Sequence, residues 1–153
     1  MSSSAVEVSI TIDAPIDEVF DLAMNPDGTL EWVTIAREVK DVKGSYTEEG
    51  FEMKQQLCLR GVPFWVSWDL VEVKAPTYAR FEGKGPMRSK AFIENRLEER
   101  DGKTVFHYKN EFKAPLGPLG STASKVLTGG VPEREANASL ANLKKIAESR
   151  VRT

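Results

Sequence analysis

Few side chains in this 153-residue chain are suited to acid–base or nucleophilic chemistry. His107 is the only imidazole and Cys58 the only thiol, so neither a His/Cys zinc site nor an intramolecular disulfide can form. Each of the two lies on the same face of its predicted strand as charged or amide side chains. This placement predicts a solvent-facing histidine and an inert thiol. We therefore assign no catalytic residue, and we expect neither a metal nor an organic cofactor.

Two carboxylates leave an enzymatic role open. Asp69 and Glu82 lie in strand regions whose register the alternation does not fix, and a β-bulge near Asp69 would turn either one inward. An inward carboxylate can act as an acid or a base, although most strand carboxylates point outward. The glycines offer no phosphate site, because Gly83-Lys84-Gly85 is followed by Pro86 and a strand rather than by the start of a helix.

Regular spacing of apolar residues predicts the elements that position these groups. Residues 6–12 alternate apolar with polar side chains, as in a half-buried strand, and two short helices follow over 16–24 and around 30–32. Residues 35–113 alternate strands with tight turns and add six strands. Residues 132–151 predict one amphipathic helix, whose buried stripe consists of Ala136, Leu140, Leu143 and Ala147.

Composition bounds both the architecture and the partners. A length of 153 residues fits a single domain over 1–153, and a sheet followed by one helix indicates an α+β fold. The net charge is −2 with both signs interspersed, so we expect no nucleic-acid partner. No apolar run approaches the roughly 20 residues of a membrane span, and the first residues lack signal-peptide features. We expect a cytoplasmic protein without integral membrane association.

Three segments carry a resemblance to a known family. The run VSITIDAPIDEVFDLAMNPDGTLEW (residues 8–32) resembles the opening of the START-like, or SRPBCC, superfamily of polyketide cyclases, lipid carriers and pollen-allergen-type proteins. VEVKAP (71–76) and SLANLKKIAE (139–148) continue it. The resemblance implies a helix-grip fold, in which a seven-stranded antiparallel sheet wraps around a long C-terminal helix and two short helices follow the first strand. Because the matching positions are core and turn residues, they indicate the fold more strongly than the function.

Such a fold leaves a concave space between sheet and helix, and a mainly apolar space with a few polar groups is a ligand site by default. The side chains on the inward faces of the strands form its walls. Most of them are apolar, and the polar exceptions are Gln55, Ser89, Asn95 and Asn110. The simpler alternative is that the same side chains only fill a core. The expected ligand-binding residues are Trp32, Phe51, Met53, Gln55, Leu57, Trp68, Phe81, Met87, Ser89, Ala91, Ile93, Phe106, Tyr108, Asn110, Leu127 and Leu140.

The resemblance leaves three functions to compare. The first is binding of a small hydrophobic or amphipathic molecule, such as a lipid, polyketide, isoprenoid or aromatic metabolite, in this cavity. The second is a cyclase or dehydratase that uses the same cavity and needs an inward acid or base. The third is a protein-interaction module resembling the Hsp90-activator branch, which an apolar patch on the outer sheet surface would favour.

The region before the C-terminal helix contains residues that interrupt helices. Gly129, Gly130 and Pro132 predict a break or sharp kink between Thr128 and Glu133. The break is either a bend that fits the helix to the sheet or a hinge that lets residues 119–128 move as a lid.

Overall fold

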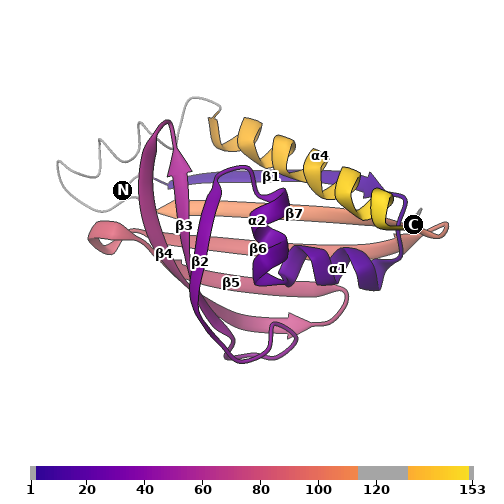
Figure 1. The fold of residues 1–153 in the computed structure, drawn as a ribbon, viewed down its shortest axis with the longest axis horizontal. Helices are drawn as coiled ribbons and strands as arrows, with labels where there is room; N and C mark the ends of the chain where they lie inside the picture. Colours follow the sequence, from indigo (N-terminus) through magenta and orange to yellow (C-terminus); the bar gives the residue numbers. More distant parts are fainter. Residues whose placement is uncertain (1–2, 114–130, 152–153) are drawn as a thin grey trace.

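A computed structural model describes residues 3–113 and 131–151 (Figure 1). The order of its elements is β1 (Ser3–Ile12), α1 (Ile16–Met24), α2 (Pro26–Trp32), β2 (Ala36–Lys43), β3 (Glu52–Leu59), β4 (Val62–Lys74), β5 (Tyr78–Lys84), the 3₁₀ turn η1 (Pro86–Arg88), β6 (Lys90–Arg100), β7 (Lys103–Lys113) and α4 (Val131–Val151).

The strands form one antiparallel sheet in the order β1-β7-β6-β5-β4-β3-β2. Figure 1 shows that the sheet curves and that the helices lie on its concave side, with α4 running beside β1. Each strand pairs with its neighbour in the chain except β1, which closes the other edge against β7. The predicted helix-grip fold, with seven strands, two short helices after the first strand and a long C-terminal helix, is confirmed.

Two-residue turns connect two of the strand pairs and hold their register. Arg60 and Gly61 connect β3 to β4 with φ of 51° and 79°, and Asp101 and Gly102 connect β6 to β7 with φ of 54° and 79°. Positive φ at both central positions matches the right-handed twist of the strands. Glycine therefore takes the second position of such turns, after a residue that tolerates positive φ. Tight turns between the strands were expected from the sequence, and these two keep the inward-facing side chains on the same face from one strand to the next.

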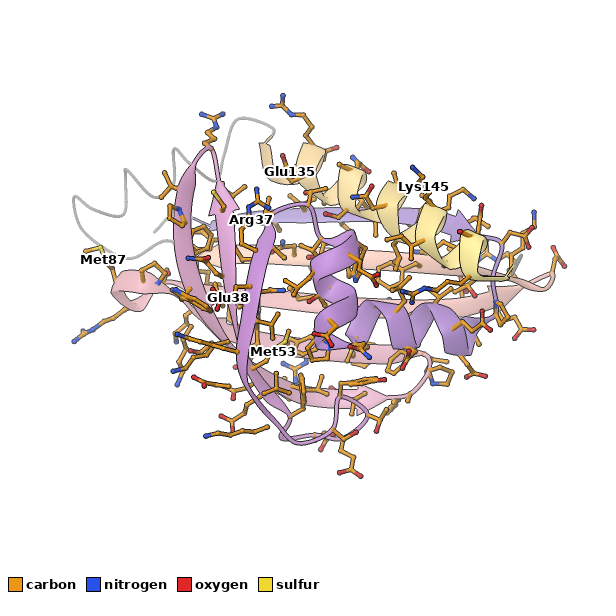
Figure 2. All side chains as sticks on the ribbon, viewed as in Figure 1. Arg37, Glu38, Met53, Met87, Glu135 and Lys145 are labelled. Atoms are coloured by element: carbon orange, nitrogen blue, oxygen red, sulfur yellow. The ribbon has the colours of Figure 1, made fainter. Side chains whose placement is uncertain are left out.

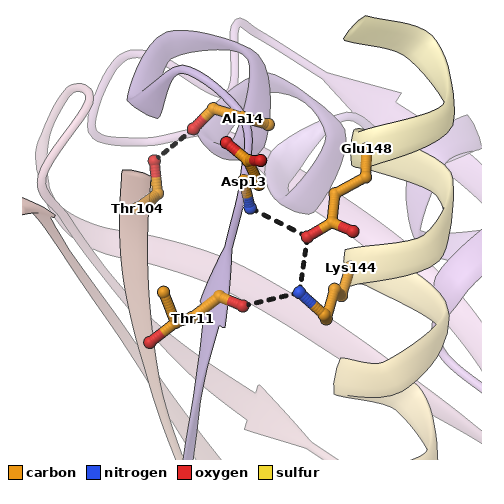
Figure 3. Close-up of polar contacts among 6 residues, drawn as sticks. All are labelled: Thr11, Asp13, Ala14, Thr104, Lys144 and Glu148. Carbon is orange, nitrogen blue, oxygen red and sulfur yellow. Dashed lines mark hydrogen bonds and ion pairs between the residues drawn. The ribbon is translucent and has the colours of Figure 1, made fainter. Parts of the chain in front are cut away.

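The helix α4 packs on the sheet through the predicted stripe. Ala136, Leu140, Leu143 and Ala147 are all buried, with Leu143 completely inaccessible. Polar contacts fasten the later turns of α4 to the end of β1 (Figure 3). Lys144 Nζ donates to the carbonyl of Thr11 at 3.1 Å, and the amide of Asp13 donates to Glu148 at 2.9 Å. Apolar burial therefore fixes the face of the helix, and these contacts fix its position along the strand.

The connection between β5 and β6 corrects one part of the predicted strand pattern. Met87 and Ser89 do not lie in a strand, because residues 86–88 form η1 and β6 begins only at Lys90. Pro86 has no amide to give to a ladder, and its carbonyl accepts from both the amide (3.1 Å) and the hydroxyl (2.7 Å) of Ser89. The chain therefore turns where continued alternation was expected.

Part of the region before α4 lies outside the described residues. Leu127, the predicted lid over 119–128 and most of the predicted break fall there, so they remain predictions. Of that break the structure describes helical backbone from Val131 onward. Pro132 then stands in the first turn of α4, where a missing amide costs no hydrogen bond.

Candidate functional site

A cavity of about 120 Å³ lies between the concave face of the sheet and the helices. Its walls come from β1, α1, α2, the α2–β2 connection, the sheet strands β3 to β7 and the start of α4. They are mostly apolar, and the lining residues are Val6, Ala23, Met24, Thr29, Trp32, Val33, Ile35, Met53, Gln55, Leu57, Leu59, Phe64, Val66, Trp68, Phe81, Ala91, Ile93, Asn95, Tyr108, Asn110, Phe112, Glu135, Ala136 and Ser139.

Most residues expected at the site are brought together in this lining, namely Trp32, Met53, Gln55, Leu57, Trp68, Phe81, Ala91, Ile93, Tyr108 and Asn110. Phe51, Phe106 and Leu140 are instead buried in the core behind the cavity wall. Met87 is 56% exposed at the tip of the β5–β6 connection (Figure 2), and Ser89 is buried beneath that tip. The expectation that Met87 faces the cavity is wrong, because the turn at Pro86 directs it outward.

A chain of hydrogen bonds fixes one wall of the cavity. The indole of Trp68 donates to Gln55 Oε1 at 3.1 Å, and Gln55 Nε2 donates to Thr29 Oγ1 at 3.2 Å. Thr29 in turn donates to the carbonyl of Pro26 at 2.6 Å. Gln55 thus has partners on both ends of its amide, so this buried polar group is satisfied without a ligand.

Two other side chains of the cavity lining each keep a polar atom without a partner. Among the described residues, the indole nitrogen of Trp32 and the Oδ1 atom of Asn95 are buried and make no hydrogen bond. Asn95 Nδ2 has only the sulfur of Met24 as an acceptor, at 3.7 Å, and a thioether accepts weakly. A buried polar group left in this state costs about 1–3 kcal/mol. Both side chains belong to the cavity lining.

Tyr108 brings a phenol into the same region. Its OH accepts from Asn110 Nδ2 at 3.5 Å, and the ring lies edge-on to Trp32 with 6.0 Å between centroids. Burial raises the pKa of Tyr108 to about 12, while the bond from Asn110 works in the opposite direction. The phenol therefore stays protonated at neutral pH and can donate a hydrogen bond, but it is a poor proton donor in catalysis.

This pKa predicts a loss of stability at high pH. Because the folded-state pKa of Tyr108 is raised above the unfolded value of 10, its contribution is complete below pH 10 and is lost as the pH rises toward 12. Between pH 9 and pH 11 the loss should be on the order of 1 kcal/mol. Denaturant titration at both pH values should show this drop in the wild type and a smaller one in Tyr108→Phe. An equal drop in both proteins would contradict the prediction.

A polar cluster at the start of α4 was not expected from the sequence. Glu135, which lines the cavity, accepts from the hydroxyl of Thr34, and Ser139 Oγ accepts from the amide of Thr34 at 3.0 Å. The sequence places Glu135 in the first turn of the predicted helix, where its negative charge favours the helix dipole, and gives no sign of a role in the cavity. The available signal was spacing, because Glu135 and Ser139 are four residues apart and flank Ala136 and Leu140 of the buried stripe.

The other reactive side chains lie outside the cavity lining. His107 contacts Glu98 at 3.2 Å with 39% of its side chain exposed, and this hydrogen bond lowers the pKa of Glu98. Cys58 is half-buried. Glu82 pairs with Arg80 at 3.1 Å on the solvent side.

Asp69 also remains off the cavity, although the expected bulge near it is present. The register of β4 against β5 shifts between Leu70 and Glu72, so the parity is reset only after Asp69. Trp68 and Leu70 on either side of it are buried, and Asp69 itself is not among the lining residues. Neither carboxylate proposed for an enzyme therefore reaches the site, whereas Glu135 does.

The residues that the structure describes contain neither a cluster of metal ligands nor a helix that could span a membrane. Nowhere in residues 3–113 and 131–151 do three His, Cys, Asp or Glu side chains gather as a metal site would require. The expected lack of a metal and of a cofactor stays a prediction. No helix within these ranges is both long and apolar enough to cross a membrane.

A curved antiparallel sheet that grips a helix over an apolar cavity defines the START-like class. Within it, the chain belongs to the polyketide cyclase / dehydrase and lipid transport family, whose model matches residues 4–148. A sequence comparison with curated proteins gives no match.

Solved structures share the fold at low sequence identity. An aromatase/cyclase, Zhui from Streptomyces sp. R1128, superposes with a TM-score of 0.76 at 19% identity, covering 98% of this chain and 96% of its own. TTHA0849 from Thermus thermophilus gives 0.74 at 12% identity, covering 96% and 99%. Major latex-like protein 151 from Panax ginseng gives 0.72 at 8% identity, covering 95% and 97%. At these identities the likeness concerns the fold alone.

Proposed function

We propose that the protein binds a small, mainly apolar molecule in the cavity beneath α4. The observation that supports this most directly is the lining, in which aromatic and aliphatic side chains from nearly every element surround a few polar groups. The family to which the chain belongs includes lipid transport, which is consistent with such a ligand. A cytoplasmic location and the absence of a nucleic-acid partner remain predictions.

The cavity volume limits the size of the ligand. A protein cavity of about 150 Å³ accepts benzene, and the cavity here measures about 120 Å³. One aromatic ring or a short aliphatic chain therefore matches the space, whereas a polyketide or a long-chain lipid requires the walls to move apart. Met53 lies in the wall and can adjust, because its unbranched side chain has several rotatable bonds.

Tryptophan fluorescence tests this proposal, because two of the three tryptophans line the cavity and the third does not. Toluene or octanol in the cavity should shift the emission of Trp32 and Trp68. The change should decrease in Trp32→Phe and in Trp68→Phe. Trp65→Phe is the matched control, since the ring of Trp65 lies beneath Lys40, with 4.1 Å from Nζ to the centroid, and is not part of the lining.

Calorimetry on the same samples makes the outcome decisive. Binding detected by heat without any change in the wild-type emission would place the ligand outside the cavity. No binding of either probe at its solubility limit would contradict the proposal itself.

One observation also favours a cyclase- or dehydratase-like enzyme as a second function. Glu135 places a carboxylate in the cavity wall, and the structural neighbours include an aromatase/cyclase. A carboxylate beside a bound substrate can remove or return a proton. Recovery of a chemically changed ligand would distinguish this function from simple binding.

The interaction-module alternative gains no support from the described residues. Their exposed large apolar side chains are Leu30, Val42, Val62 and Met87, one each on α2, β2, β4 and η1. The outer sheet surface instead carries ion pairs such as Arg96 with Glu94 at 3.1 Å.

A further inference from the structure

The charges around the cavity argue against an anionic ligand. Among the described residues of the lining, Glu135 carries a carboxylate and none is a lysine, arginine or histidine. A ligand carboxylate or phosphate would therefore lose its water without gaining a cationic partner, and it would share the cavity with the charge of Glu135. Burial of an anion under these conditions is strongly unfavourable.

The atoms without partners indicate what the ligand carries instead. Asn95 Oδ1 is an acceptor without a donor, and Trp32 Nε1 is a donor without an acceptor. Asn95 stands opposite Tyr108 in the β6–β7 register, and the indole of Trp32 lies edge-on to the same Tyr108 ring. Both residues are thus neighbours of one side chain, although they come from different elements.

A hydroxyl is the simplest group that can pair with both atoms, because it has one donor and two acceptor lone pairs. A ketone lacks the donor that Asn95 requires, and a protonated amine lacks the acceptor that Trp32 requires. Asn95 Nδ2 keeps its contact to the sulfur of Met24 at 3.7 Å, so Oδ1 is the end of the amide that requires a donor. Tyr108 adds a phenol that can donate or accept beside it.

We propose that the cavity selects an uncharged apolar molecule carrying one hydroxyl group, such as a phenol or a small alcohol, whose hydroxyl lies between Asn95, Trp32 and Tyr108. This inference rests on the proposed function, because it assigns the chemical class of ligand to the same cavity. Selection against carboxylates follows from Glu135 and from the lack of a cation in the described lining.

Calorimetry with three ligands of similar shape tests the selection. The probes are p-cresol, p-xylene and p-toluate, which differ in one substituent on the same ring. We expect p-cresol to bind about tenfold more tightly than p-xylene, which corresponds to one added hydrogen-bonded group. We expect p-toluate at neutral pH to bind more weakly than both.

Two variants connect the preference to the named residues. In Asn95→Leu, which keeps a similar volume, the tenfold advantage of p-cresol over p-xylene should disappear while p-xylene still binds. Asn137→Leu, on the exposed side of α4, is the matched control and should keep the advantage. In Glu135→Gln the affinity for p-toluate should rise while that for p-xylene stays unchanged.

The outcomes separate this inference from the function on which it rests. Equal affinities of the wild type for p-cresol and p-xylene would overturn the hydroxyl preference and leave apolar binding in place. Tight binding of p-toluate would overturn the selection against anions. Failure of all three probes to bind would contradict both proposals, and because these readings use the wild type, none depends on a variant that folds poorly.

Discussion

Replacing Trp32 by alanine is expected to lower the free energy of unfolding by about 3–5 kcal/mol. The side chain is 3% exposed and packs edge-on against Phe106 and Tyr108, with centroids 6.1 and 6.0 Å away. Its carbonyl also accepts from Asn142 of α4 at 3.4 Å. Because Trp32 ends α2 where α2, the sheet and α4 meet, no single neighbour can move in to fill the space left behind.

The same substitution on the outer surface provides the control. Trp65→Ala removes an equal volume from a half-buried position, where the ring supports Lys40, and a cation–π contact at an exposed site contributes about 0.5–1 kcal/mol. Urea titration should therefore separate the two variants by at least about 2 kcal/mol. Similar losses in both would show that Trp32 does not connect the layers as described. A surviving Trp32→Ala protein should also bind larger ligands, because the new space joins the cavity.

The sequence was sufficient for the sheet, the helices and most of the cavity wall. Period-two alternation placed Met53, Gln55 and Leu57 on the inner face of one strand, and the packed sheet allows no other direction for them. The stripe from Ala136 to Ala147 likewise identified the buried face of α4. Both patterns depend on short-range geometry, which a single sequence contains.

The remaining errors concern positions where geometry depends on distant contacts. Met87 has an apolar side chain at the expected parity, yet the turn at Pro86 gives it a φ of 57° and directs it to solvent. The expected bulge near Asp69 does occur, between Leu70 and Glu72, but pairing with β5 places it where it does not turn Asp69 into the cavity. Glu135 reaches the cavity only because α4 crosses the sheet beside Thr34, more than a hundred residues away in the chain.

Gly83→Ala is expected to lower the free energy of unfolding by about 2–3 kcal/mol, at the upper end of the usual cost of overpacking. A Cβ atom at this position would lie 2.6 Å from two ring atoms of Trp68 and 2.7 Å from Val66 Cγ1. The indole cannot easily withdraw, since it donates to Gln55 and packs edge-on against Phe81 at 6.3 Å. Relief of the clash must therefore displace a cavity wall, so the affinity for toluene should fall along with stability.

Enlarging the side chain of Ala91 gives a contrast to Gly83→Ala. Ala91 pairs directly with Gly83 across the β5–β6 ladder and lines the cavity. Ala91→Val adds two methyl groups toward open space, so its stability should stay within about 1 kcal/mol of the wild type. Its ligand affinity should nevertheless fall, because the added volume occupies the site. Denaturation and calorimetry on both variants distinguish the two effects.

If Gly83→Ala proves as stable as Ala91→Val, the close packing of Trp68 over Gly83 is not what fixes this wall. If Ala91→Val binds toluene as tightly as the wild type, the ligand does not occupy the cavity beside Ala91.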